Sequence, residues 1–160
     1  MAGGRISVGK PAPPFSLTDQ NGRSVALADL AGRWTVLYFY PKDDTPNCTI
    51  QACDFTDALQ AFQGLDAVVV GCSPDSPESH RKFIAKHQLR IRLLSDPDHA
   101  VINSYGAWGK KAMSGRTVTG VLRSTVLIDP AGKVAYHWPS VTAAGHSEEV
   151  REKLAELRRG

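Results

Sequence analysis

The sequence predicts an α/β protein built around a parallel β-sheet, and three observations lead to this prediction. Residues 34–40 and 65–72 are continuous runs of β-branched, aromatic and other apolar residues, which is typical of strands buried on both faces. Each run is followed by a segment whose apolar residues recur at helical spacing. Strands and helices therefore alternate along the chain, and this order is typical of βαβ units.

Length and composition are those of one ordinary globular domain, which we expect to span residues 1–160. Of the 160 residues, 42% are hydrophobic and 22% are charged. The net charge of +3 is scattered along the chain, so it does not indicate a nucleic-acid partner. No apolar run approaches the ~18 to 20 residues of a membrane span, so a membrane partner is not expected either.

The cysteine count and the first residues predict a cytoplasmic protein. Residues 1–9 lack the apolar stretch of a secretion signal. Three cysteines, an odd number, fit a reducing compartment in which thiols serve chemistry or packing.

The first elements are predicted from turn and periodicity signals. AsnGly at 21 and 22 lies between two short apolar runs and indicates a β-hairpin. Residues 34–40 are expected to form the central strand of the sheet. The segment after this strand is expected to be helical. Its apolar residues recur at helical spacing, at Ala52, Phe55, Leu59 and Phe62.

The middle of the chain continues the alternation. A helix is predicted over residues 77–88, followed by a short strand at 91–94 and a short helix at 99–105. Residues 106–120 are polar and contain several glycines, so we expect a loop.

The last three elements are a pair of strands and a helix. Residues 121–128 and 134–138 flank the turn signal AspProAlaGly and predict an antiparallel hairpin at the end of the sheet. The final helix is expected to begin after Ser147 as its N-cap, with acidic residues in its first turn and ArgArg at its end.

The sharpest chemical signal is Cys48, which follows the strand at 34–40 and begins the next helix. Thr45 is a favoured N-cap and Pro46 suits the first helical position, so Cys48 falls in the first turn. We expect the Thr45 hydroxyl to bond a backbone N–H of that turn. A thiolate at this place is favoured by the positive end of the helix dipole, which is typical of reactive cysteines.

Two considerations weigh against a reactive Cys48. Free cysteine is often buried, and a cysteine on an apolar helix stripe is more often part of the core. In addition, Asp43 and Asp44 would oppose a thiolate. A cation must then lie nearby, either Lys42 or an arginine distant in sequence.

The spacing of Cys48 and Cys53 excludes two familiar kinds of site. In an intact helix their Cα atoms would lie roughly 8.6 Å apart, whereas a disulfide needs about 7 Å or less. The pair is therefore neither a C-x-x-C redox motif nor half of a zinc site, and it can be bridged only if the helix unwinds. Cys72 and the five histidines are interpreted as core or solvated residues, and no nucleotide-binding motif is present. We expect neither a metal nor another cofactor.

Residues 38–55 resemble the active-site segment of peroxiredoxins, specifically the peroxiredoxin Q or bacterioferritin comigratory protein group. The pattern P-x-x-x-T-x-x-C at Pro41, Thr45 and Cys48 is highly specific, and residues 121–134 resemble its companion segment. The similarity extends over essentially the whole chain, from residues 9–17 to the last helix.

The resemblance implies a thioredoxin-like fold with a central mixed sheet, flanking helices and an N-terminal hairpin extension. It implies a thiol peroxidase for hydrogen peroxide and small organic hydroperoxides, with Cys48 as the nucleophile and Cys53 as the resolving cysteine. Pro41 would shield the thiol, Thr45 would hydrogen-bond the peroxide, and Arg123 would favour the thiolate. A thioredoxin or similar dithiol would be the reductant, and we expect a monomer.

Two residues depart from the family pattern. Asn47 stands where the family usually has Gly, and its side chain narrows access to the thiol, which bears on substrate size. Gln51 stands where many members have a Glu that orients the active-site arginine. Neither change removes the nucleophile.

Two other functions are weighed against the peroxidase. A thiol–disulfide oxidoreductase of the same fold is disfavoured because it would carry C-x-x-C. A non-catalytic redox sensor switched by a Cys48–Cys53 disulfide is the alternative from another class. Turnover separates them, since an enzyme consumes many equivalents of peroxide and a sensor consumes about one.

Overall fold

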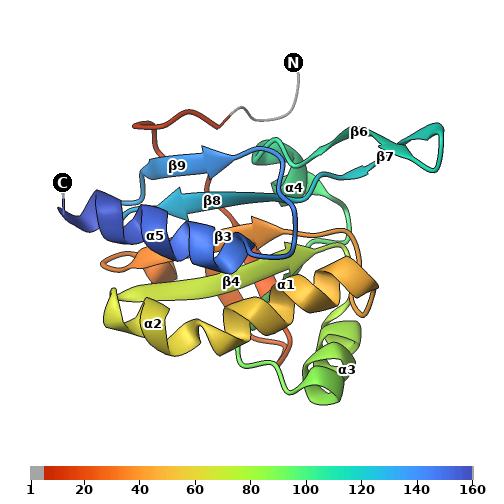
Figure 1. Ribbon diagram of the computed structural model, residues 1–160, viewed down its shortest axis with the longest axis horizontal. Coiled ribbons are helices and arrows are strands. Elements are labelled where there is room, and N and C mark those ends of the chain that lie inside the picture. The colour runs from red at the N-terminus through yellow and green to blue at the C-terminus, as the bar shows by residue number, and fades with distance from the viewer. Residues whose placement is uncertain (1–5, 160) are drawn as a thin grey trace.

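The computed structural model describes residues 6–159, apart from the side chain of Met113. A seven-stranded sheet forms the centre of the molecule, and a separate two-stranded hairpin extends away from it (Figure 1). The seven strands lie in the order β2-β1-β5-β4-β3-β8-β9. Their bounds are β1 Ser16–Asp19, β2 Ser24–Ala26, β3 Trp34–Phe39, β4 Ala67–Ser73, β5 Arg92–Ser95, β8 Ser124–Ile128 and β9 Val134–Trp138.

The sheet is mixed, as predicted. Strands β3, β4 and β5 are parallel to one another, which confirms the βαβ units, while all other neighbours are antiparallel. The hairpin at AsnGly and the final pair β8–β9 are also confirmed. The middle strand is β4 rather than β3, so that expectation was wrong. Both strands carry the same apolar pattern, and the pattern of one strand does not encode its place across a sheet.

Helices cover both faces of the sheet, and each face has its own core. The helices are η1 Leu27–Leu30, a 3₁₀ helix, and the α-helices α1 Pro46–Asp57, α2 Leu59–Gly64, α3 Pro77–His87, α4 Ala100–Ser104 and α5 His146–Arg159. Along β3, Val36 and Tyr38 belong to the core under α1, α2, α3 and α5, whereas Leu37 and Phe39 belong to the core on the side of α4. This two-sided burial explains why the strand is apolar at every position.

The structure corrects the sequence predictions at two helices. The predicted helix through Leu59 and Phe62 is two helices, because the backbone leaves helical geometry at Ala58, with φ −89° and ψ 0°. The last helix begins at His146, so Ser147 lies inside it and is not its N-cap. Among residues 6–159, no helix is long and apolar enough to cross a membrane.

The predicted loop at 106–120 is instead an antiparallel hairpin of β6 (Trp108–Met113) and β7 (Arg116–Val121). Its turn holds Ser114 and Gly115, both with positive φ. Only Val121 of β7 is buried and half of the strand is exposed, so the ribbon lacks the alternation of apolar and polar residues that marks a half-buried strand. A polar composition was therefore mistaken for a loop.

Candidate active site

Cys48 lies where the sequence places it, in the first turn of α1. Thr45 is the N-cap, with extended backbone, and Pro46 is the first helical residue. The Cys48 side chain is only 1% exposed and packs within the core between α1 and the sheet. Strand β3 and helix α1 thus hold the thiol at a helix N-terminus and largely away from water.

Arg123, distant in sequence, provides the cation that the thiol needs. It lies in the short link between β7 and β8, and its Nη2 donates to Cys48 Sγ at 3.3 Å. Its Nη1 donates to Oε1 of Gln51 at 2.7 Å, one turn further along α1. The planar guanidinium therefore bridges two positions on the same helix and places its positive charge against the sulfur.

Gln51 holds Arg123 in place but has one side-chain donor without a partner among the described residues. Its side chain is buried, and its Oε1 fixes the guanidinium of Arg123. Its Nε2 has no hydrogen-bond partner among the described residues. A carboxylate at this position would leave no unpaired donor, so the departure from the family's Glu has a visible structural consequence.

Thr45 does not make the bond expected of it. Its hydroxyl donates to the carbonyl oxygen of Lys42 at 2.8 Å instead of accepting from an N–H of the first turn. A hydroxyl that donates in this way still has lone pairs with which to accept a hydrogen bond. Pro41 is half-buried directly after Tyr40, at the start of the segment that leads to α1.

The two aspartates before Cys48 contact side chains of α3. Asp43 is buried and accepts hydrogen bonds from Tyr40 Oη at 2.6 Å and Ser79 Oγ at 2.8 Å, and it pairs with His80 Nδ1 at 2.7 Å. Asp44 is exposed and contacts both Lys86 and His87, which lower its pKa. The charge conflict foreseen from the sequence is therefore met by α3 for the carboxylates and by Arg123 for the thiol. Lys42 is exposed, and it is Arg123 that contacts Cys48.

Asp43, Asp75 and His80 form the cluster with the best spacing for a metal ion within the described chain, with donor atoms within 4.8 Å of one another. These atoms already bind protein groups. Asp75 accepts from Ser73 Oγ and from the backbone N–H of Asp43. His80 uses both ring nitrogens, because Nε2 lies 2.9 Å from the Leu94 carbonyl. A bound metal would have to displace these bonds, so the cluster fits a structural network that ties α3 to the segment before Cys48.

The second cysteine of α1 is also a free thiol in this structure. Cys53 is half-buried, five residues after Cys48 on an unbroken helix. Burial raises its pKa, and the nearby carboxylates of Asp57 and Asp54 raise it further. While α1 is intact, Cys53 therefore stays protonated at neutral pH.

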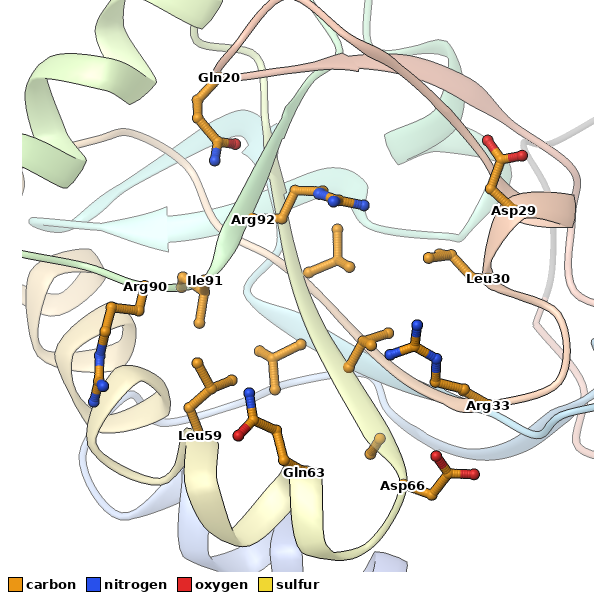
Figure 2. Close-up of a pocket in the computed structure, with 14 residues that line it drawn as sticks. Gln20, Asp29, Leu30, Arg33, Leu59, Gln63, Asp66, Arg90, Ile91 and Arg92 are labelled. Carbon is orange, nitrogen blue, oxygen red and sulfur yellow. The ribbon is translucent and has the colours of Figure 1, made fainter.

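Cys72 and a cleft beside β4 lie apart from this thiol site. Cys72 is fully buried in the core on the side of α4, and burial raises its pKa well above the ordinary value. The cleft, of about 430 Å³, lies beside the first residues of β4 and is lined by Arg33, Arg90 and Arg92 among others (Figure 2). None of the three cysteines is among its lining residues.

Sequence reasoning missed Lys111. This residue lies on β6, in the segment predicted as a loop, and its side chain is half-buried. Its pKa is lowered, chiefly by burial and then by the charge of Arg123, while the sulfur of Cys48 acts in the opposite direction. The basic residue is thus electrostatically coupled to the site, and only the folding of the hairpin reveals it.

Comparisons with known proteins identify the family of the chain. The model of the "AhpC/TSA family" matches residues 8–137. Peroxiredoxin Bcp of Bacillus subtilis is 42% identical over 152 residues, which cover 95% of this chain and 97% of the relative. A solved structure of Xanthomonas campestris peroxiredoxin Q superposes with a TM-score of 0.84 at 39% identity, covering 89% of this chain and 90% of the other.

A further solved structure comes from a relative whose reaction is described. It shows a trapped intermediate/ligand complex of the bacterioferritin comigratory protein of Xanthomonas campestris, described in terms of alkyl peroxide reduction activity. The similarity is 35% in identity with a TM-score of 0.87, over 94% of this chain and 99% of the other.

Proposed function

The chain belongs to the AhpC/TSA family and is a peroxiredoxin, a thiol-dependent peroxidase, and we propose that Cys48 is the residue that attacks the peroxide. The observation that carries this proposal is the contact of 3.3 Å between the Arg123 guanidinium and Cys48 Sγ at a helix N-terminus. Cys72 differs, because burial and then the charge of Asp96 raise its pKa, and none of the hydrogen bonds among the described residues joins it to a cation.

The first step transfers two electrons from sulfur to the peroxide. The Cys48 thiolate attacks one oxygen, an S–O bond forms and the O–O bond breaks, leaving a sulfenic acid and an alkoxide or hydroxide that takes up a proton. Arg123 and the N–H groups of the first turn stabilise the negative charge that develops on the leaving oxygen. The Thr45 hydroxyl, which donates to Lys42, accepts a hydrogen bond from the peroxide O–H.

The second step forms a disulfide between Cys48 and Cys53. The Cys53 thiolate attacks the sulfenic sulfur, an S–S bond forms, and the hydroxyl group leaves as water after taking up a proton. The two positions lie on one helix with Cα atoms roughly 8.6 Å apart, beyond the reach of a disulfide. The first turns of α1 must therefore unwind. Unwinding also exposes Cys53 to water, which removes the burial that raises its pKa.

A dithiol reductant completes the cycle by thiol–disulfide exchange. We expect a thioredoxin-like protein in this role, because two thiols return both cysteines to the reduced state in one encounter. Substrates in this proposal are hydrogen peroxide and small organic hydroperoxides, the second in keeping with the alkyl peroxide reduction described for the Xanthomonas campestris relative. Asn47 is exposed beside Cys48 and is expected to limit the size of the peroxide.

A coupled assay tests the proposal. Thioredoxin, thioredoxin reductase and NADPH are mixed with this protein and either hydrogen peroxide or cumene hydroperoxide. We expect many equivalents of peroxide to be consumed, with hydrogen peroxide preferred over the bulky peroxide. Consumption of only about one equivalent would indicate the sensor instead of the enzyme, and activity that persists in Cys48→Ser would contradict the role of Cys48.

A further inference from the structure

The side chain of Lys111 takes an unusual course for a lysine on a projecting hairpin. Lys111 pairs with Val118, yet its Nζ donates to the carbonyl oxygen of Val121 at 2.8 Å. The residue directly opposite Val121 is Trp108, three positions nearer the base of the hairpin. The side chain therefore runs back along the ribbon towards the body of the molecule.

Gly120 leaves the space for this course. A Cβ at that position would lie 3.4 Å from Cε and 3.7 Å from Nζ of Lys111, so the end of the lysine lies directly over the glycine. The ammonium is thereby held at the base of the hairpin.

The carbonyl group that Lys111 binds belongs to Val121, two residues before the active-site arginine. Val121 ends β7, and Arg123 follows two residues later and contacts Cys48. The backbone of this link is itself held, since Leu122 N–H donates to the Ala107 carbonyl and Val141 N–H donates to the Arg123 carbonyl. Lys111 thus binds the segment from which the guanidinium reaches the thiol.

The Lys111 ammonium interacts electrostatically with both Arg123 and Cys48. Burial and the charge of Arg123 lower the pKa of Lys111, whereas the sulfur of Cys48 raises it. Two cations brought together repel each other unless an anion lies between them. The Cys48 thiolate contacts Arg123 and acts on Lys111 through space, so its negative charge offsets this repulsion.

The other ionisable groups around the thiol do not supply positive charge. Tyr38 of β3 and Cys53 of α1 have raised pKa values and are neutral at pH 7. Asp43, whose charge acts on Tyr38, is paired with His80. Arg123 and Lys111 are therefore the cations to consider within the described residues.

We propose that Lys111 is a positioning residue of the peroxidase, whose ammonium, anchored on Val121, supplies a second positive charge to the Cys48 thiolate and holds the segment that carries Arg123. The inference rests on the proposed role of Cys48. Lys111 does not contact the sulfur; it acts through the charge it adds and through the placement of Arg123.

Variants of two adjacent lysines test this proposal. Lys111→Met removes the charge, whereas Lys110→Met makes the same change one residue earlier, at an exposed position on the opposite face of β6. We expect Lys111→Met to shift the pH midpoint of Cys48 alkylation upwards and, below that midpoint, to slow both alkylation and the first oxidation about three- to tenfold. Lys110→Met should behave like the wild type. The difference should shrink in 1 M salt, because salt screens a partly exposed charge.

Two further variants separate charge from structure. Lys111→Arg should restore the wild-type pH midpoint, and Lys111→Gln, which keeps a donor for the Val121 carbonyl but not the charge, should resemble Lys111→Met. Urea unfolding confirms that each variant is folded. Equal profiles for Lys111→Met and Lys110→Met, or wild-type behaviour of Lys111→Gln, would overturn the proposal. Peroxidase activity in Cys48→Ser would instead show that the proposed function itself is wrong.

Discussion

Three cysteines of one chain have three different surroundings, and these differences set their chemistry. Cys48 is buried but contacts Arg123, Cys53 is half-buried beside two carboxylates, and Cys72 is fully buried among apolar side chains. Reactivity requires a thiolate, so the cation beside Cys48 distinguishes it from the other two.

Cys48→Ser is expected to abolish peroxide consumption, whereas Cys72→Ser should leave it nearly intact. A hydroxyl at position 72 loses packing and lies in an apolar core, so the free energy of unfolding should fall by about 1–3 kcal/mol. The coupled assay, run well below the melting temperature of each variant, measures the activity. Comparable loss in both variants would show that Cys72 takes part in the chemistry.

Arg123→Met should lower the rate of Cys48 oxidation on the order of 100-fold, because a preorganised donor and a full positive charge are removed together. Arg123→Lys keeps the charge but cannot reach Gln51 and Cys48 with one planar group, so we expect an intermediate rate. Stopped-flow oxidation and the pH profile of alkylation measure both effects. An unchanged pH profile in Arg123→Met would mean that the guanidinium does not set the charge of the thiol.

At the scale of elements, the proposed reaction cycle needs helix α1 both in its folded form and partly unwound. In the proposed cycle the helix is folded to place Cys48 against Arg123, and it unwinds to bring Cys48 to Cys53. The apolar contacts of Phe55, which stacks on Tyr38 with ring centroids 4.8 Å apart, hold the folded form. The resolving step therefore depends on the local stability of this helix.

Oxidation is expected to remove protection from hydrogen exchange across residues 46–58, and reduction should restore it. The control is Cys53→Ser, in which peroxide leaves a sulfenic acid without a disulfide and the helix should stay protected. Peptide mapping of the oxidised wild type identifies the link. Unchanged protection on oxidation, or a map without a Cys48–Cys53 link, would withdraw the resolving role from Cys53.

Helix α5 makes the stability of the fold depend on pH. His146, at its start, is buried, with Nε2 2.8 Å from Thr125 Oγ1 on β8, and burial lowers its pKa from the ordinary 6.5. The folded state therefore favours neutral imidazole. Below about pH 6.5 the unfolded chain binds the extra proton more readily, so the stabilising contribution is complete above that pH and is lost as the pH falls towards the folded pKa.

We accordingly expect the free energy of unfolding to decrease between pH 7 and pH 5, with a shallower decrease in His146→Gln. Urea titrations at several pH values measure both slopes. Part of the decrease should remain in the variant, because burial also lowers the pKa of His137. Identical slopes for variant and wild type would show that His146 does not contribute.

At the scale of the whole molecule, the described surface offers little for a permanent partner. Among residues 6–159, the large hydrophobic side chains that are exposed are Val8 and Ile50, and they are single residues rather than a patch. A stable dimer buries roughly 1,200 Å² or more, much of it apolar at its centre.

Sedimentation equilibrium should therefore give the monomer mass of 17.3 kDa for both the reduced and the oxidised protein. Unwinding of α1 on oxidation exposes apolar residues only locally and should not create a large interface. A mass near twice this value in either redox state would contradict the expected monomer.

The sequence by itself determined the strands β3 and β4, the start of α1 at Pro46 and the position of Cys48 in its first turn. These features are local, since burial on both faces demands apolar runs and a helix N-terminus demands a capping residue and a proline-tolerant position. The resemblance to peroxiredoxins named Arg123, and the fold brings it to the thiol across 75 residues of sequence.

Only the tertiary structure decided the order of strands across the sheet, the pairing of β6 with β7 and the surroundings of each charged group. Asp43 contacts Ser79 and His80 on α3, Gln51 holds Arg123, and Lys111 reaches the base of its hairpin. These contacts join segments distant in sequence, and an exposed ribbon of polar residues carries no periodic signal. The charge that activates a thiol is set by what folding brings to it through space, which no local pattern encodes.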